Sequence, residues 1–324
     1  MIKLSNVKDF TLTDVYGKKI DDNFKKKRTA HLLATFNTFK PDILITELYH
    51  FGRRKFSFEL LPLLEMAHKA VKRPIIISSI RDILVESKKE RLLATVELIH
   101  KYYDMVLVHG DESFIPLSKT FPFADKIAEK IHYSGYVISS TATNVGSKVL
   151  AQNQIVVSTG SGGHDFGYSM LMCAIAAKEL TELKNFRWHL LVSAQLSVEK
   201  YNDLKKYEDA NLLIERHRID VADILQQSKL AIMRGGYNSV MDVYIAKIPA
   251  VIIPYSHRGE EEQKLRADTF HKVGRFVSLD YGQMKPESLA TSVNTAFHRK
   301  ENFHNFQLNT AGVRNSISLI KSML

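Results

Sequence analysis

Two glycine-rich segments in the second half of the chain carry the strongest chemical signal in the sequence. The first segment is Gly160, Ser161, Gly162 and Gly163, and the second includes Arg234, Gly235, Gly236, Asn238 and Ser239. Each follows an apolar, strand-like run and precedes a helix-like run, and Asn238 or Ser239 is expected to cap the second helix. A small-residue turn in that position aims backbone N–H groups and the positive end of a helix dipole at one point. Two such anion sites in one sheet predict a ligand that carries a diphosphate.

Several polar side chains near these segments suit the rest of such a ligand. Asp242 lies one turn inside the second predicted helix, where it can accept hydrogen bonds from ribose hydroxyls or simply favour the helix dipole. Glu262 and Gln263 follow a predicted strand at the sheet edge where ligands collect, so they are expected to hold sugar hydroxyls. Arg234 either offsets diphosphate charge or pairs with a local carboxylate. His164 either reaches the site or caps its helix, and tight turns without a ligand are the structural alternative for both segments.

A second set of reactive side chains lies in the first half, where three predicted strands end. Glu47 ends the first strand, Asp82 follows the second, and His109 ends the third and is followed by Asp111. Because the carboxyl ends of parallel strands share one edge of the sheet, these side chains are expected to face a cleft. Each is a candidate general base for deprotonating an acceptor hydroxyl. The alternative for each is a structural ion pair or cap.

The elements that must position these residues follow an alternating pattern. Predicted strands at 42–46, 74–79, 105–109 and 132–137 alternate with predicted helices at 58–70 and 88–101. The second half continues the pattern with strands at 155–158, 187–193, 210–214, 230–233, 250–254 and 275–278, and helices at 198–207, 221–227, 238–246, 260–271, 286–297 and about 303–321. Buried strands alternating with helices predict an α/β fold with parallel sheets. The first forty residues show only weak strand or helix signals.

Length and composition predict two soluble domains. With 324 residues, 45% of them hydrophobic and 25% charged, the chain has an ordinary globular composition. We expect an acceptor-side domain at 1–138, a Ser-, Thr-, Asn- and Gly-rich linker at 139–154, and a nucleotide-sugar-binding domain at 155–324 closed by a C-terminal helix. The single cysteine, Cys173, lies in an apolar helical run and is interpreted as a core residue rather than a nucleophile. No apolar stretch is long enough to span a membrane, and no signal peptide is recognised, so the predicted location is the cytoplasm.

The net charge of +10 indicates either an anionic binding partner or a basic surface exposed to solvent. Basic clusters at 25–28 and 53–55 are consistent with peripheral contact with an anionic membrane at its inner face, or with a glycan. In proteins that bind single-stranded nucleic acid, aromatic residues alternate with basic clusters. They do not do so here, so no nucleic-acid partner is expected. The CxxC, HExxH, GxSxG and P-loop patterns are missing, so neither a metal nor a cofactor is expected.

The second half of the chain resembles the C-terminal domain of the MurG-related glycosyltransferases. The matching residues are Arg234, Gly235, Gly236, Ser239 and Asp242, the run from Lys247 through Pro249 to Pro254, and Gln263. Asp242 stands where the family usually has Glu, and Lys247 where it usually has Gly. The shorter acid is the weaker match for the ribose contact.

The whole chain is similar to a set of predicted bacterial glycosyltransferases of the same superfamily. The similar stretches are 41–47, 51–54, 58–64, 79–83, 108–111, 135–137, 236–239 and 261–267, with Arg28. The resemblance implies the GT-B architecture, which has two Rossmann-like domains facing across a cleft, the nucleotide on the second domain and no obligatory metal. Members of the family begin with a strand and a Gly-x-Gly-His loop, which residues 1–40 do not match. The first domain is therefore expected to be truncated, with catalysis impaired. The alternatives are a misassigned start codon or a partner that supplies the missing segment.

These observations predict a metal-independent hexosyltransferase. It would transfer a hexose or N-acetylhexosamine from a nucleotide-diphosphate sugar, a UDP-sugar by preference, to an unidentified glycan or lipid-linked acceptor. The donor is a substrate, so no cofactor is involved. Two alternatives stay open at this point: a non-catalytic relic or scaffold that binds a nucleotide-sugar, and a sugar-nucleotide epimerase of similar two-domain fold.

Overall fold

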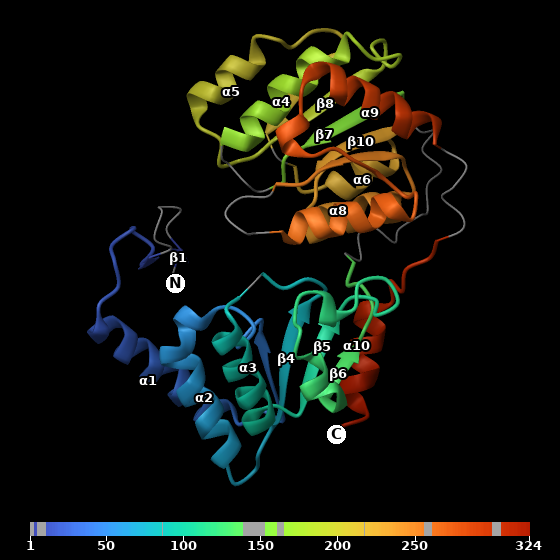
Figure 1. Ribbon diagram of the computed structural model, residues 1–324. Helices are drawn as coiled ribbons and strands as arrows, with labels where there is room; N and C mark the ends of the chain where they lie inside the picture. Colours follow the sequence, from blue (N-terminus) through green and yellow to red (C-terminus); the bar gives the residue numbers. More distant parts are fainter. Residues whose placement is uncertain are drawn as a thin grey trace. The chain divides into compact units, whose positions relative to one another are not determined.

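The computed structural model describes residues 3–4, 11–85, 87–138, 153–160, 165–216, 218–255, 261–299 and 306–324 (Figure 1). The chain divides into two compact units, which are described separately. The first unit comprises residues 1–135 and 314–324, and the second comprises residues 136–313. No helix among the described residues combines the length and the apolar character needed to cross a membrane.

The first unit is built on a four-stranded parallel sheet. Its strands, in spatial order, are β3 (Ile43–Glu47), β4 (Ile75–Arg81), β5 (Met105–His109) and β6 (Ile131–Tyr133). The remaining elements are α1 (Asp22–Phe39), α2 (Ser57–Lys69), α3 (Lys89–Tyr102), the 3-10 turns η1 (Arg54–Phe56), η2 (Leu117–Lys119) and η3 (Ala124–Lys130), and a small antiparallel pair, β1 (Lys3–Leu4) with β2 (Leu12–Thr13). The regular alternation of apolar runs thus predicts this sheet correctly.

Helix α1 is the element of this unit that sequence patterning misses. It has 18 residues and begins where the Asp21 side chain accepts a hydrogen bond of 2.7 Å from the backbone N–H of Phe24. Phe36 is the one buried residue along its length. Because the helix buries so little, its sequence lacks the apolar periodicity by which a helix is recognised.

Strand β3 differs from the expected buried strand because it pairs with β4 alone among the described strands. Its middle residue, Ile45, is 50% exposed, and Ile43 and Leu44 are partly exposed. An apolar run predicts a strand correctly here, but it does not distinguish a central strand from an edge strand.

The second unit holds a six-stranded parallel sheet in the order β12-β11-β10-β7-β8-β9. The strands are β7 (Gln154–Ser158), β8 (Arg187–Val192), β9 (Leu212–Arg216), β10 (Leu230–Arg234), β11 (Ala250–Ile253) and β12 (Val277–Ser278), and the helices are α4 (Asp165–Lys178), α5 (Val198–Lys205), α6 (Val221–Gln226), α7 (Tyr237–Ala246), α8 (Glu262–Lys272) and α9 (Pro286–His298). The chain runs from β7 outward to β9 and then crosses back to β10 on the other side of β7. This reversal of strand order is where doubly wound sheets bind their ligands.

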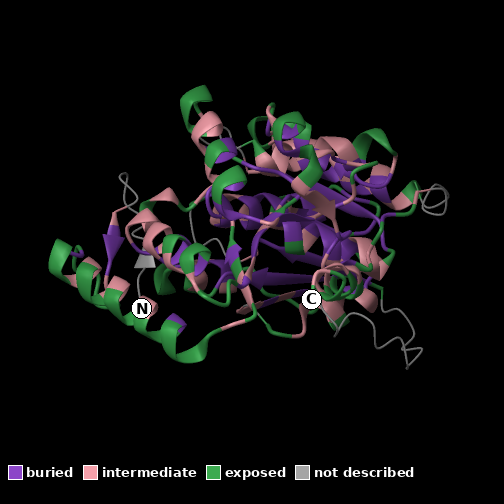
Figure 2. Cartoon of the chain, turned by 90° about the horizontal axis from the view of Figure 1, so that it is seen from below, coloured by how far each residue is buried: buried purple, intermediate pink, exposed green. Residues whose placement is uncertain are grey.

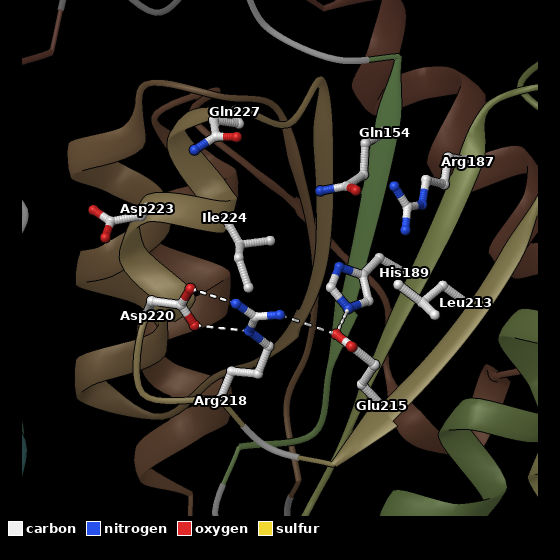
Figure 3. A pocket seen from close by; sticks show the side chains of 10 residues that line it. All are labelled: Gln154, Arg187, His189, Leu213, Glu215, Arg218, Asp220, Asp223, Ile224 and Gln227. Atoms are coloured by element: carbon white, nitrogen blue, oxygen red, sulfur yellow. Dashed lines mark hydrogen bonds and ion pairs between the residues drawn. The ribbon is translucent and has the colours of Figure 1, made fainter. Parts of the chain in front are cut away.

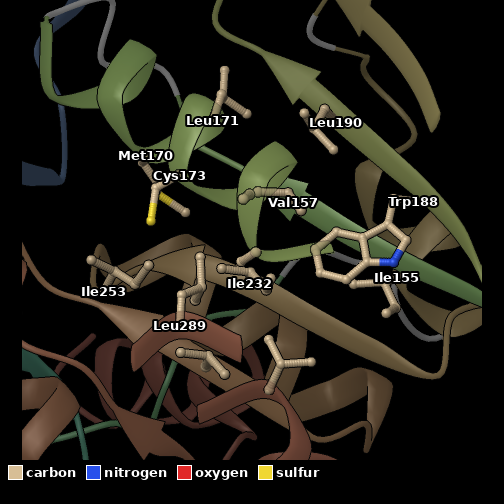
Figure 4. Close-up of a cluster of buried hydrophobic side chains, with 14 of the residues drawn as sticks. Ile155, Val157, Met170, Leu171, Cys173, Trp188, Leu190, Ile232, Ile253 and Leu289 are labelled. Atoms are coloured by element: carbon tan, nitrogen blue, oxygen red, sulfur yellow. The ribbon is translucent and has the colours of Figure 1, made fainter. Parts of the chain in front are cut away.

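The core of the second unit forms between one face of this sheet and helices α4 and α9 (Figure 4). Trp188 is fully buried there, and its indole N–H donates to the Leu183 carbonyl at 3.1 Å. Cys173 packs into the same cluster, which confirms it as a core residue, and burial raises the pKa of its thiol to about 11. Figure 2 shows the same pattern at large, since the strands are mostly buried while the helices present exposed outer faces.

The C-terminal helix departs from the expected domain division. Helix α10 (Gly312–Lys321) begins later than the predicted start near residue 303, and residues 314–324 belong to the first unit rather than to the second. Its apolar residues Leu319 and Ile320 pack against Ile77 and Leu107 of the first sheet, where Figure 1 shows the helix beside β5 and β6. The helix thus covers a sheet face that would otherwise expose apolar side chains. Most of the predicted linker, 139–154, lies outside the described residues.

Candidate functional site

The two glycine-rich segments meet at the reversal of strand order in the second unit, because β7 and β10 are neighbours. Gly160 follows β7 with a positive φ of 65°, a conformation that favours glycine. A Cβ atom at Gly160 would lie 3.7 Å from Ser239 Oγ, so the loop after β7 reaches the first turn of α7. Ser161, Gly162, Gly163 and His164 lie outside the described residues.

The N-terminus of α7 has the character of an anion site. Its cap residue is Gly236, no side chain among the described residues caps the helix, and a Cβ atom at Gly236 would meet no described atom within 4 Å. The expectation that Asn238 or Ser239 caps α7 is therefore wrong, since both lie inside the first turn. N–H groups at a helix N-terminus without a side-chain cap can bind water or a ligand, so we treat this turn as the candidate anion site.

Gly235 serves a different purpose from Gly236. A Cβ atom at Gly235 would lie 2.7 Å from the carbonyl oxygen of Gln263, too close for any side chain. The loop after β10 therefore packs directly on the first turn of α8. Glycine at this position is required by packing between loop and helix rather than by the approach of a ligand.

Arg234 ends β10 between the two loops. Its guanidinium carbon lies 5.1 Å from the ring centroid of Phe166 and 5.2 Å from that of Tyr255. Its Nη1 also donates to the Thr159 carbonyl at 3.4 Å. Rings and a carbonyl oxygen orient the guanidinium at the end of β10.

Asp242 is a partly buried carboxylate inside α7. Burial raises the pKa of this carboxyl to about 6. No side chain or backbone group in the described part of the chain forms a hydrogen bond or an ion pair with it. Burying a carboxylate without partners is unfavourable, so Asp242 is the residue of this site that most needs a ligand.

Glu262 and Gln263 are engaged in holding loops together. Gln263 Oε1 accepts a hydrogen bond of 3.1 Å from the backbone N–H of Tyr255. Glu262 Oε1 accepts from Arg266 at 2.9 Å, and Arg266, which is fully buried, also donates to the Gly235 carbonyl at 2.8 Å. Arg266 is a positioning residue that sequence reasoning missed. Its one signal is its place four residues after Glu262, on the same face of the helix.

In the first unit, the structure brings Glu47 and His109 to one face of the sheet. Glu47 is opposite Ser79 and His109 is opposite Arg81, so the side chains of these four residues project from the same face. His109 Nε2 lies 2.8 Å from Ser79 Oγ, and its Nδ1 lies 2.9 Å from Ser134 Oγ. Burial and, to a lesser extent, the Arg81 charge lower the pKa of His109, which favours the neutral imidazole.

The other two candidate bases lie elsewhere. Asp82 is fully buried beside Gly110, where a Cβ atom would come within 2.9 Å of the Asp82 Cβ, and it accepts a hydrogen bond from the Ile83 N–H at 3.0 Å. Asp111 accepts hydrogen bonds from the N–H and hydroxyl of Ser113 at 3.1 and 2.6 Å. Asp82 thus lies in the interior and Asp111 holds a turn, whereas Glu47 and His109 share one face of the sheet.

A cavity of about 320 Å³ lies apart from these residues, between β8, β9 and α6 (Figure 3). Four of its lining side chains pair with one another. His189 Nε2 lies 2.8 Å from Glu215, and Arg218 binds Asp220 through two hydrogen bonds of 2.8 and 2.7 Å. None of the predicted site residues lines this cavity, so the candidate donor site is the one at the carboxyl ends of β7 and β10.

Comparison with known proteins supports this assignment. Residues 154–321 match the family described as the glycosyltransferase family 28 C-terminal domain. A protein of Nostoc sp. called UDP-N-acetylglucosamine–N-acetylmuramyl-(pentapeptide) pyrophosphoryl-undecaprenol N-acetylglucosamine transferase is 32% identical over 74 residues. That match spans 23% of this chain and about a fifth of the relative, 21% of its length.

Solved structures extend the likeness to both units. The glycotransferase of kitacinnamycin superposes with a TM-score of 0.60 at 14% identity, covering 93% of this chain and 81% of that one. MurG of Acinetobacter baumannii superposes with a TM-score of 0.59 at 16% identity, covering 99% of this chain and 84% of that one. At these identities the structures establish the fold, which is α/β with parallel sheets and of the GT-B type.

Proposed function

The chain belongs to the family defined by the glycosyltransferase family 28 C-terminal domain, and on this premise we propose that it transfers a hexose or N-acetylhexosamine from a UDP-sugar. Three features of strand β10 and of helix α7, which follows it, support the proposal. They are the N-terminus of α7, which no described side chain caps, the Arg234 guanidinium, and the Asp242 carboxylate, which has no hydrogen bond or ion pair to a described residue. A nucleoside diphosphate supplies a complement for each of them.

In the proposed complex, the diphosphate binds the N–H groups of the first turn of α7 and the Arg234 side chain. Asp242 accepts hydrogen bonds from ribose hydroxyls, and these bonds compensate for burial of its charge. When the sugar leaves, negative charge develops on the diphosphate, and the N–H groups and Arg234 stabilise it. Positive charge supplied by the protein is the basis for proposing that neither a metal nor a cofactor is required.

Glu262 and Gln263 remain the proposed contacts of the donor sugar. They would use the polar atoms that do not bond to Arg266 or to Tyr255. Gln263 uses its Oε1 toward Tyr255, which leaves the amide N–H groups as donors. In the first unit, Glu47 and neutral His109 are the proposed bases for the acceptor hydroxyl. The Nostoc relative acts, by its name, on a pyrophosphoryl-undecaprenol acceptor, and we propose a lipid-linked acceptor and cytoplasmic location here also.

The test is a titration of the purified chain with UDP, UDP-hexoses, GDP and ADP. The melting temperature of the chain is measured at each ligand concentration. A nucleotide at about a hundred times its dissociation constant adds roughly 2.7 kcal/mol to the free energy of unfolding. We expect stabilisation by uridine nucleotides, lost in Asp242→Ala and Arg234→Ala. Asp223→Ala, which removes an exposed acid of α6, is the matched control and keeps the response. Equal stabilisation of the control and the two site variants would place the nucleotide elsewhere.

A further inference from the structure

The Arg234 guanidinium lies in a corner formed by two aromatic rings. Its carbon is 5.1 Å from the ring centroid of Phe166 and 5.2 Å from that of Tyr255. The centroids of the two rings are 4.8 Å apart, and their planes cross at 67°. A guanidinium within about 6 Å of a ring centroid is attracted by the electrons of the ring, so both rings favour this position of the side chain.

The two rings come from the segments on either side of Arg234 in the sheet. Arg234 ends β10, which pairs with β7 on one side and with β11 on the other. Phe166 lies in the first turn of α4, the helix after β7, and Tyr255 follows β11. Because the carboxyl ends of neighbouring parallel strands lie side by side, the sheet itself brings these three side chains together.

The two rings are themselves fixed by other contacts. Phe166 is 5% exposed within the core of the second unit, and its ring centroid also lies 4.6 Å from that of Tyr281. The backbone N–H of Tyr255 donates to Gln263 Oε1 at 3.1 Å, which ties this residue to α8. Because the core and α8 anchor the rings, the rings restrict the orientation of the guanidinium.

Such a restriction favours the binding of a ligand. An arginine side chain that rotates freely loses conformational entropy when it binds a ligand. Where rings hold the guanidinium before the ligand arrives, this loss accompanies folding instead of binding. Aromatic rings carry no formal charge, so they hold a guanidinium without neutralising it, as a carboxylate would.

We propose that Phe166 and Tyr255 are positioning residues for the donor, which hold Arg234 in the orientation that binds the diphosphate. This inference rests on the proposed transferase function and adds to it two residues that act on the donor through Arg234. Loss of either ring then weakens binding of the diphosphate and not of the nucleoside, because only the diphosphate meets Arg234. A purely structural role of the rings predicts equal losses for the two ligands.

The test measures the dissociation constants of UDP, by calorimetry, and of uridine, by NMR titration, on the full chain and its ring variants. Phe166→Leu and Tyr255→Leu should each weaken UDP binding at least fivefold and uridine binding less than twofold. Tyr255→Phe, which keeps the ring, should retain the affinity for UDP within twofold. Tyr255 is only partly buried, so its variants test the proposal even if Phe166→Leu does not fold.

A second comparison tests whether the rings act through the guanidinium. In Arg234→Gln, which lacks the guanidinium, adding Tyr255→Leu should weaken UDP binding by less than twofold, because the ring then has nothing to position. A full fivefold loss in this background would show that Tyr255 acts on the nucleotide without Arg234, and it would overturn the proposal.

The matched control is Tyr168→Leu. Tyr168 lies in the same helix as Phe166, and its ring faces a different cation, since Lys200 Nζ is 5.4 Å from its centroid. This change removes a cation–ring contact from α4 without removing a contact of Arg234, so it should alter the affinity for UDP less than twofold.

Three results would overturn the role of the rings while leaving UDP binding by the natural chain, and with it the donor site, intact. They are an equal loss in Tyr168→Leu, an equal loss for uridine, and an unchanged affinity for UDP in a folded leucine variant of Phe166 or Tyr255. A natural chain that binds no uridine nucleotide would contradict the transferase function and this inference together.

Discussion

Replacing Asp242 by Asn should stabilise the ligand-free protein while weakening its binding of nucleotide. The pKa of this carboxyl is about 6 in the folded protein and 3.8 in its unperturbed state, with burial as the cause. The folded state therefore holds the proton more tightly than the unfolded state does. The associated stability is fully present below pH 3.8 and is lost as pH rises through 6.

At about 1.4 kcal/mol for each pH unit between the two pKa values, the ionised Asp242 costs the folded state up to about 3 kcal/mol at neutral pH. Asn has nearly the same shape and carries no charge, so Asp242→Asn removes this cost. The variant should match the natural chain at pH 4 and exceed its stability increasingly up to pH 7. For a domain of this size, the gain at neutral pH corresponds to a melting temperature several degrees higher.

The single tryptophan makes the assay specific to the correct unit. Trp188 is fully buried in the core of the second unit, which also contains Asp242, so its fluorescence reports unfolding of that unit. Melting is followed from pH 4 to pH 8, with and without UDP. We expect UDP to stabilise the natural chain more than the variant. A variant that is less stable at pH 7, or whose difference from the natural chain does not depend on pH, would refute this account of Asp242.

Three further predictions follow from close contacts and burial. Gly235→Ala should destabilise the second unit by about 1–3 kcal/mol, because the new methyl group would lie 2.7 Å from the Gln263 carbonyl oxygen. Gly236→Ala, whose methyl group meets nothing within 4 Å, should leave the melting temperature nearly unchanged, and equal effects of the two would contradict the packing argument. Arg266→Gln should cost about 1–3 kcal/mol in urea unfolding, because the Gly235 carbonyl loses its donor; an unchanged midpoint would show that this bond is dispensable. The Cys173 thiol, with its pKa raised to about 11, should resist a thiol reagent at pH 8 until the chain unfolds, so prompt labelling of the native protein would contradict its burial.

The strands could be predicted closely from the sequence because each buried strand is a short apolar run. The prediction at 105–109 coincides with β5, and the strands before the two glycine-rich segments lie in one sheet, as expected. Helix α1 could not be predicted in this way, since its single buried residue leaves no periodic pattern. The sheet that α10 packs against could not be predicted either. Apolar residues on a helix indicate that it is packed, but they do not indicate which sheet it contacts.

Within the candidate site, residue types were easier to predict than their roles. The pattern around Arg234 and Asp242 predicts the site, and in the structure Arg234 ends β10 while Asp242 lies in α7, the helix that follows. The two adjacent glycines look equivalent in sequence, yet only the contacts with Gln263 separate the packing role of Gly235 from the open position of Gly236. Such roles depend on neighbours distant in the chain, which local spacing does not encode.

The most direct test of the donor site is a binding cycle that combines one protein change with one ligand change. Calorimetry would compare UDP with 2′,3′-dideoxy-UDP on the natural chain and on Asp242→Asn. If Asp242 binds the ribose, the natural chain should prefer UDP by at least tenfold, which is about 1.4 kcal/mol, and the variant should lose that preference. An equal preference in both proteins, or no binding of UDP to the natural chain, would contradict the assignment of this site to a uridine nucleotide.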